Sequence, residues 1–254
     1  MIVGVPKEIK SSEFRVGVTP ATGARIVNEN HTLIVEKNAG IGIGASDDDY
    51  KKIGAHVVES ASDVFNKSEM IVKVKEPQKP EWEMLKEGQI LFTYLHLAAD
   101  PDQAEGLMKS KCHAIAYETI TDNRGTLPLL APMSEIAGRL AVFEGAYHSK
   151  KTSGGPGALI SGVPGVKPSK VVILGGGMVG TNAAHMAAGL GADVTIFDKS
   201  IDRLRYLNDI FGNSAKVLYS EKIALEEQLS DADLIIGAVL VPGATAPKLI
   251  DRKF

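Results

Sequence analysis

The chain has 254 residues, 44% of them hydrophobic and 23% charged, which is typical of a globular protein with core material for one large or two ordinary domains. A formal net charge of −3 gives no general attraction to nucleic acid or anionic lipid, and no apolar run is long enough to span a membrane. The single cysteine, Cys112, excludes an internal disulfide and a cysteine-based metal cluster, and we predict no metal site. The apolar stretch at the start is too short for a signal peptide, which predicts a cytoplasmic protein.

Strand-like and helix-like segments alternate from the first residue onward. Thr19 followed by Pro20 is typical of a helix N-cap and first position, so we expect a helix over about 20–29. The segment 99–111 has an acidic first turn and a basic last turn, which suits the helix dipole. Short apolar runs that predict strands lie at residues 1–5, 32–36, 70–74, 90–94 and 113–117. Strands separated by helices pair in parallel, which predicts an α/β domain.

The middle of the chain predicts a long helix followed by a segment with the composition of a loop or a domain junction. Residues 132–150 predict one amphipathic helix, and residues 151–170 are rich in Gly, Pro and Ser, as loops are. Beyond them the alternation restarts, with strand-like runs at 171–174, 193–197, 215–219 and 232–240. We therefore predict two Rossmann-like α/β domains with mostly parallel sheets. Residues 1–130 form the substrate domain, and residues 131–254 form an incomplete doubly wound dinucleotide-binding domain.

A glycine motif follows the strand at 171–174. Gly175, Gly177 and Gly180 form G-x-G-x-x-G between that strand and a helix. The first glycine permits a tight turn, the second lets the backbone approach a pyrophosphate, and the third lets the helix pack on the strand. A tight turn without a ligand is the alternative, and the surrounding strand, helix and later acidic residue together argue against it. The motif therefore predicts a dinucleotide site.

An acidic residue at the end of the next strand indicates which dinucleotide binds. Asp198 lies 18 residues beyond Gly180, where a carboxylate accepts hydrogen bonds from the ribose 2′-hydroxyl and repels a 2′-phosphate. This favours NAD over NADP. Arg203 could accommodate that phosphate in another context, but beside Asp198 we interpret it as packing next to the adenine.

Three residues of the first domain are candidates for contact with a substrate. Arg15 lies in a polar loop before a capped helix, Lys75 ends one strand, and His96 follows another. Parallel sheets bind ligands at the carboxyl ends of their strands. Each residue has an ordinary alternative, since loop cations are usually solvated and a lone histidine usually has a structural partner.

Six segments together carry a family resemblance over the whole chain. They are GVPKEIKSSEFRVGVTP, VKVKEP, LFTYLHLA, AIAYETI, LPLLAPMSEIAGRLA and GGGMVGTNAA, in this order. They closely resemble bacterial alanine dehydrogenases, whose relatives include the NAD-binding subunit of proton-translocating transhydrogenase and the saccharopine dehydrogenases. The resemblance joins both domains and is more specific than the glycine motif alone.

The resemblance implies a role for each matching residue. Arg15 would bind the carboxylate of alanine or pyruvate, Lys75 would contact the carbonyl or amino group, and His96 would be the general acid and base. Glu118 and Met133 resemble residues that line the substrate pocket. Contacts to the cofactor are implied for Ser134, Asp198, Arg203, Ser220, Val239 and Leu240. The implied reaction is the reversible, NAD-dependent oxidative deamination of L-alanine to pyruvate and ammonia, in a homohexamer.

The sequence departs from the family at its C-terminal end. Alanine dehydrogenases are about half as long again, and the last strands of the dinucleotide domain, the return segment to the first domain and a catalytic aspartate have no counterpart here. We expect a fragment or a premature stop rather than a remnant. Two alternative functions stay open: a catalytically silent NAD-binding module, and the transhydrogenase NAD-binding subunit.

Overall fold

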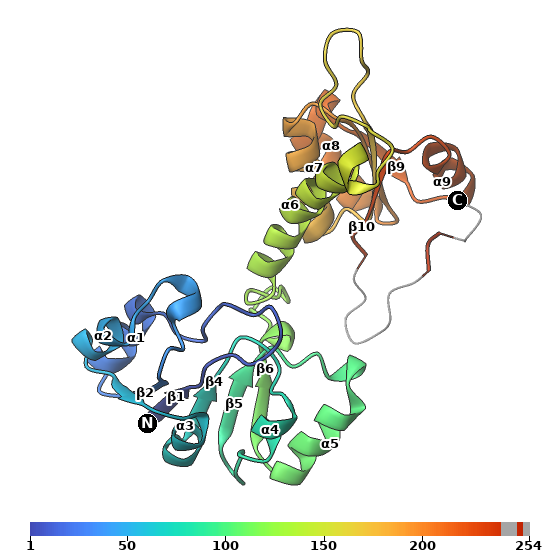
Figure 1. The fold of residues 1–254 in the computed structure, drawn as a ribbon. Helices are drawn as coiled ribbons and strands as arrows, with labels where there is room; N and C mark the ends of the chain where they lie inside the picture. Colours follow the sequence, from blue (N-terminus) through green and yellow to red (C-terminus); the bar gives the residue numbers. More distant parts are fainter. Residues whose placement is uncertain (240–247, 251–254) are drawn as a thin grey trace. The chain divides into compact units, whose positions relative to one another are not determined.

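The computed structural model describes residues 1–239 and 248–250. The chain divides into two compact units, Met1–Leu129 and Leu130–Phe254. Each unit contains its own parallel β-sheet, and Figure 1 shows helices against each of them. The predicted α/β class with two mostly parallel sheets is confirmed.

The first unit contains a six-stranded parallel sheet in the order β3-β2-β1-β4-β5-β6. The strand order reverses between β1 and β4, so their carboxyl ends flank the topological switch point where such sheets bind ligands. The strands are β1 (Ile2–Val5), β2 (Thr32–Glu36), β3 (His56–Val58), β4 (Met70–Val72), β5 (Ile90–Thr93) and β6 (His113–Ala116).

Helices connect these strands, and two of them begin where the sequence predicts. Thr19 caps α1 by accepting the N–H of Thr22 at 3.3 Å, and Pro20 is its first residue. Asp100 caps α5 in the same way, through the N–H of Gln103 at 3.0 Å. The helices are α1 (Pro20–Asn28), α2 (Asp47–Lys52), α3 (Ala61–Lys67), α4 (Lys79–Trp82) and α5 (Pro101–Ser110).

Apolar side chains cover both faces of the first sheet. On β2, Leu33 and Val35 pack into one buried cluster, whereas Ile34 packs into another. This alternation follows from the period of two along a strand, and burial on both faces is typical of parallel sheets. The strand β3 was not predicted from the sequence. It has only three residues, pairs only with β2 at the edge of the sheet, and none of its residues is fully buried.

The second unit has a four-stranded parallel sheet among the described residues, in the order β10-β7-β8-β9. This places the first strand of the unit in the centre, beside the last, as in a doubly wound fold. Its elements are α6 (Ala131–His148), β7 (Lys170–Leu174), α7 (Met178–Gly189), β8 (Asp193–Asp198), α8 (Ile201–Phe211), β9 (Lys216–Tyr219), α9 (Lys222–Leu229) and β10 (Leu234–Gly237).

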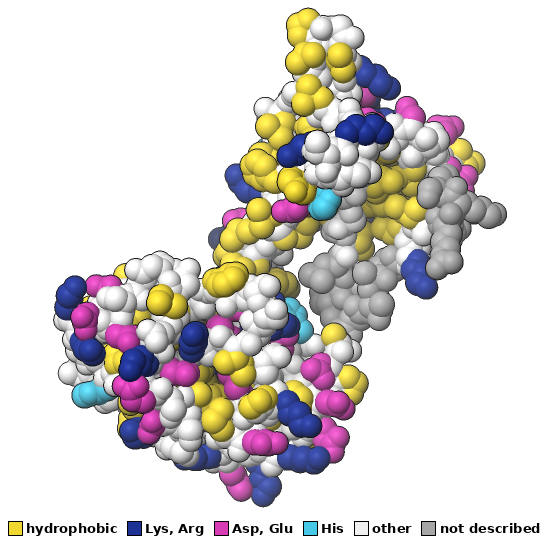
Figure 2. Space-filling view, in the orientation of Figure 1, with side chains coloured by type: hydrophobic (Ala, Val, Ile, Leu, Met, Phe, Trp, Pro, Cys, Tyr) yellow, Lys and Arg dark blue, Asp and Glu magenta, His cyan; other side chains and the backbone are white. Residues whose placement is uncertain are grey.

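The long helix α6 packs closely against α7 within this unit. A Cβ on Gly138 would lie 2.2 Å from the carbonyl oxygen of Val179, so only glycine permits this approach. The other side of α6 exposes an apolar stripe at helical spacing: Ile136, Leu140, Phe143 and Tyr147. Figure 2 shows hydrophobic side chains gathered over this helix. No helix in the described part of the chain has the length and apolar character needed to cross a membrane.

Candidate functional site

The turn between β7 and α7 has the backbone geometry of an anion site. Gly175 has a φ of +101°, which residues with a side chain rarely adopt, and a Cβ on Gly180 would lie only 1.8 Å from the Gly175 carbonyl oxygen. A Cβ on Gly177 would meet nothing within 4 Å, so the space in front of that residue is open. No side chain caps the start of α7 at Gly177. Its backbone N–H groups and dipole therefore suit a phosphate.

A cavity of about 480 Å³ opens beside this turn in the second unit. Its volume is in the range of small-molecule and cofactor sites. Most of the predicted cofactor residues line it: Ser134, Gly175, Gly177, Asp198, Ser220 and Val239. Apolar walls come from Leu174, Met178 and Phe197. Gly180 lies behind the turn rather than in the wall, and Leu240 lies outside the described residues.

Asp198 stands at the end of β8 and ties two backbone segments together. Its Oδ2 accepts the N–H of Gly176, and its Oδ1 accepts the N–H of Ser200, each at 2.8 Å. A carboxylate oxygen can accept more than one hydrogen bond, so this arrangement leaves acceptor capacity for ribose hydroxyls.

Arg203 contacts the glycine turn in this structure. Its Nε donates to the carbonyl oxygen of Gly176 at 2.5 Å, and its Nη2 donates to Oγ1 of Thr181 at 2.7 Å. The guanidinium also lies 4.5 Å from the ring centre of Tyr206. These contacts make Arg203 a brace for the turn, a role that the sequence did not reveal. Its contact with the adenine stays a prediction.

The candidate substrate residues of the first unit gather at the carboxyl edge of its sheet. Arg15 comes from the loop after β1, Lys75 from the loop after β4, His96 from the loop after β5, and Glu118 from the segment after β6. The charges of Lys75 and Glu118 both act on His96, and that of Arg15 acts on Tyr94. Four loops that are distant in sequence therefore form one polar cluster along the carboxyl edge of the sheet, beginning at the switch point between β1 and β4.

Arg15 is oriented by a neighbouring carboxylate that the sequence analysis did not single out. Nε of Arg15 donates to Oε1 of Glu13 at 2.8 Å, and Nη2 donates to Oε2 at 2.6 Å. The backbone N–H of Arg15 donates to the same Oε1 at 2.9 Å. These hydrogen bonds, together with the charges of Arg15 and Lys75, lower the pKa of Glu13 to about 2 despite its partial burial.

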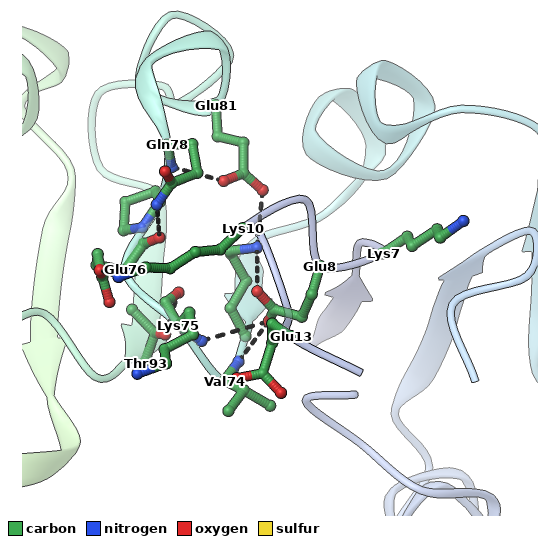
Figure 3. A network of polar contacts seen from close by, with 12 residues as sticks. Lys7, Glu8, Lys10, Glu13, Val74, Lys75, Glu76, Gln78, Glu81 and Thr93 are labelled. Atoms are coloured by element: carbon green, nitrogen blue, oxygen red, sulfur yellow. Dashed lines mark hydrogen bonds and ion pairs between the residues drawn. The ribbon is translucent and has the colours of Figure 1, made fainter. Parts of the chain in front are cut away.

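The backbone of Lys75 is held from both sides, as Figure 3 shows. Oε1 of Glu8 accepts the N–H of Val74 at 2.6 Å and that of Lys75 at 3.4 Å, and the hydroxyl of Thr93 donates to the Lys75 carbonyl at 2.8 Å. Beside it, Lys10 pairs with Glu76. The direction in which the Lys75 side chain leaves the sheet is thus fixed by contacts on its own backbone.

A buried ion network supports this loop. The ammonium of Lys73 is fully buried and lies 3.0 Å from Oε2 of Glu8 and 2.7 Å from Oε1 of Glu81. Burial raises the pKa of Glu81, and the charge of Lys73 opposes that rise. The sequence VKVKEP does not reveal which lysine is buried, because Lys73 and Lys75 are two residues apart and would share one side of an extended strand.

His96 has a strained backbone held in place by Glu118. Its φ of 51° lies in the left-handed region, which is uncommon for residues other than glycine and clusters at functional sites. Oε1 of Glu118 accepts the N–H of His96 at 2.7 Å and that of Leu95 at 3.1 Å. The ring of Tyr94 stacks beside the imidazole with 6.0 Å between ring centres. Tyr94 is a further site residue that the sequence analysis missed.

The environment of His96 favours its neutral form. Partial burial of the imidazole lowers its pKa most, the positive charges of Lys75 and Lys10 lower it further, and the negative charge of Glu118 opposes them. A histidine of this kind accepts protons at neutral pH. Met133 lies in the first turn of α6, which belongs to the second unit.

Comparison with known proteins assigns the family. Residues 4–137 match the family described as alanine dehydrogenase/PNT, N-terminal domain, and residues 141–254 match its C-terminal domain. The chain belongs to the alanine dehydrogenase/PNT family. The resemblance predicted from the sequence motifs is confirmed, and the match to this family extends through both units.

Several members of the alanine dehydrogenase/PNT family are similar over the full length of the chain. An alanine dehydrogenase of Methanococcus maripaludis is 51% identical over 253 residues, covering 100% of this chain and 68% of its own length. One of Bacillus subtilis is 50% identical and is covered over 66% of its length. The chain therefore spans about two thirds of each relative.

Solved structures of the family share the fold. A structure of an L-alanine dehydrogenase superposes with a TM-score of 0.93 at 53% identity, covering 100% of this chain and 70% of that one. A transhydrogenase from Sinorhizobium meliloti gives a TM-score of 0.83 at 24% identity, covering 100% of this chain and 74% of that one, and this likeness concerns the fold alone.

Proposed function

We propose that this chain is an NAD-dependent alanine dehydrogenase, which catalyses the reversible oxidative deamination of L-alanine to pyruvate and ammonia. The observation that carries the proposal is the cluster of Arg15, Lys75 and His96 at the switch point of the first sheet. Relatives at about half identity are named alanine dehydrogenase. A cation-lined cluster in one unit and a glycine turn in the other are the two parts that such a reaction needs.

NAD rather than NADP is the proposed cofactor. Asp198 offers a carboxylate in the cavity beside the glycine turn, and a negative charge there repels a 2′-phosphate. The open space at Gly177 and the uncapped start of α7 fit a pyrophosphate. The residues proposed to hold the cofactor are Ser134, Gly175, Gly177, Gly180, Asp198, Arg203, Ser220, Val239 and Leu240.

Each residue of the first cluster has a proposed task. Arg15 holds the substrate carboxylate through parallel N–H···O bonds, and Lys75 orients the carbonyl or amino group. His96 accepts and returns the protons that hydration of the imine and release of ammonia require. Bound NAD supplies the acceptor for the hydride from the α-carbon. Glu118 and Met133 are proposed to border the substrate, and Glu118 also holds the backbone of His96.

The function is tested by following NADH formation from L-alanine and NAD at 340 nm, with D-alanine as control. The measurement is made with this chain and with a version of the full length of its relatives. The proposal expects turnover that requires L-alanine. If the longer version binds NADH but is inactive, a silent NAD-binding module is favoured. If it exchanges hydride between nucleotides and an Arg15→Ala variant does so equally well, the alternative function as a transhydrogenase NAD-binding subunit is favoured.

The pH dependence of His96 should follow its neighbours. Because Lys75 lowers the His96 pKa, a Lys75→Met variant should raise it, and protonation should begin at a higher pH than in the parent chain. NMR titration of the imidazole Cε1 proton measures this without turnover, and Lys109→Met on α5, whose lysine pairs with Glu105, serves as control. An unchanged or lower His96 pKa in Lys75→Met would contradict the assigned geometry.

Two glycines of the turn should respond differently to alanine. Gly177→Ala meets no neighbouring atom, so the thermal unfolding midpoint should stay within a few degrees while NADH binding weakens at least tenfold. Gly180→Ala places a methyl group 1.8 Å from the Gly175 carbonyl and should lower both stability and NADH affinity. Calorimetric titration and thermal unfolding of both variants test this. Equal NADH affinity in Gly177→Ala and the parent would contradict the pyrophosphate site.

We further propose that the protein acts in the cytoplasm as a homo-oligomer, a hexamer by family resemblance. The exposed apolar stripe on α6 supports self-association, since contiguous apolar patches often mark interfaces. Light scattering after size-exclusion chromatography measures the assembly mass directly.

A further inference from the structure

Glu13 is a carboxylate that forms an ion pair with Arg15, the proposed substrate-binding cation. It forms a two-pronged ion pair with Nε and Nη2 of Arg15 and also accepts the backbone N–H of that residue. Its side chain is only 7% exposed, whereas that of Arg15 is 44% exposed. The Glu13 carboxylate therefore lies beneath the Arg15 guanidinium and contacts its Nε–Nη2 edge. These contacts fix the orientation of the guanidinium plane.

The charge of Glu13 is permanent over the working pH range. Its hydrogen bonds to Arg15 hold its pKa near 2, and the charge of Lys75 contributes to the same lowering. Glu13 is thus coupled to both cations to which the proposed function assigns substrate contacts. The neighbouring lysines have other anions beside them: Lys10 pairs with Glu76, and buried Lys73 lies between Glu8 and Glu81.

We infer that Glu13 is a specificity-determining residue, which reserves the cluster for substrates with a single carboxylate. This inference rests on the proposed function, because it takes Arg15 and Lys75 as the groups that face the substrate. Glu13 places a fixed negative charge beside both of these cations. A second carboxylate on the substrate would bring a further negative charge close to Glu13.

The physical basis is like-charge repulsion in a partly desolvated site. Two negative charges a few ångströms apart repel far more strongly near protein than in bulk water. Rejection of a wrong ligand by a fixed charge is a common source of specificity. The neutral amide of a Glu13→Gln variant keeps the shape of the side chain and removes the repulsion.

The test uses two pyruvate-sized anions that differ by one charge. Oxamate carries one carboxylate and a neutral amide, whereas oxalate carries two carboxylates, so the ratio of their dissociation constants reports charge and not size. Calorimetric titration of this chain gives both constants without turnover. The parent should bind oxamate at least tenfold more tightly than oxalate, and the charge-free variants Glu13→Gln and Glu13→Ser should lower that ratio at least tenfold.

Two controls separate charge from structure. Glu13→Asp keeps the charge and should keep the preference for oxamate. Glu59→Gln removes an exposed carboxylate that pairs with Lys37 and should leave the ratio unchanged. A ratio in folded Glu13→Gln or Glu13→Ser that stays within twofold of the parent value would overturn the inference, as would a parent that binds neither anion. Failure of the proposed function has a different result: the chain would still discriminate between the two anions but would form no NADH from L-alanine.

Discussion

Replacing Lys73 with methionine is expected to lower the free energy of unfolding by about 3–5 kcal/mol, the usual range when one partner of a buried ion pair is removed. Lys73 is fully buried between Glu8 and Glu81, whose side chains are each 2% exposed. Methionine fills a similar volume but leaves two buried carboxylates without a counter-charge. Urea denaturation monitored by circular dichroism measures the loss.

The pH dependence of this loss has a definite sign. Without Lys73 the folded-state pKa of Glu81 should lie further above its unfolded value, since burial already raises it in the presence of the lysine. The variant should therefore recover stability at mildly acidic pH, where Glu81 is protonated, and lose it as the pH rises. Lys37→Met breaks an exposed pair with Glu59 and should cost far less than Lys73→Met. A Lys73→Met loss as small as that of Lys37→Met would contradict the buried network.

Replacing His96 with glutamine is expected to lower kcat for pyruvate reduction by about 10²–10⁴-fold, the usual contribution of a general acid and base. The KM for pyruvate should change far less, because the proposed substrate contacts of Arg15 and Lys75 are kept. The strained backbone of His96 and its anchoring by Glu118 place the imidazole at the carboxyl edge of the sheet. Steady-state kinetics across the pH range measures both constants.

A second histidine provides the matched control for this experiment. His113 begins β6 and is exposed at the opposite, amino-terminal end of the same sheet. His113→Gln should leave kcat within about twofold, in line with the small effects of surface substitutions. If His96→Gln behaved like His113→Gln, His96 would not be the proton-transfer residue.

Much of the fold could be predicted because local patterns and global topology agree. Thr19 with Pro20 is a strong local signal for a helix start. The apolar run 171–174 followed by Gly175 predicts a strand and a tight turn. The three-residue strand β3 could not be found in this way. Its pairing with β2 depends on a neighbour 20 and more residues away, and its side chains are only partly buried.

The candidate site was predictable only in part, for a similar reason. Arg15, Lys75 and His96 stand at ends of predicted segments, where ligand residues are expected. Glu13 and Glu8 are recognised only through their partners, since a carboxylate in a polar loop looks the same whether it is solvated or holds a cation. Tyr94 reads as an ordinary strand residue until its ring is seen stacked on His96.

The most direct test of the proposed function is a crystal structure of the protein with NADH and pyruvate in the absence of ammonia. We expect the pyruvate carboxylate within hydrogen-bonding distance of Arg15, its carbonyl oxygen facing Lys75 and His96, and the NADH pyrophosphate at Gly177 beside the start of α7. Pyruvate bound away from these three residues, or a pyrophosphate bound away from the Gly175–Gly180 turn, would contradict it.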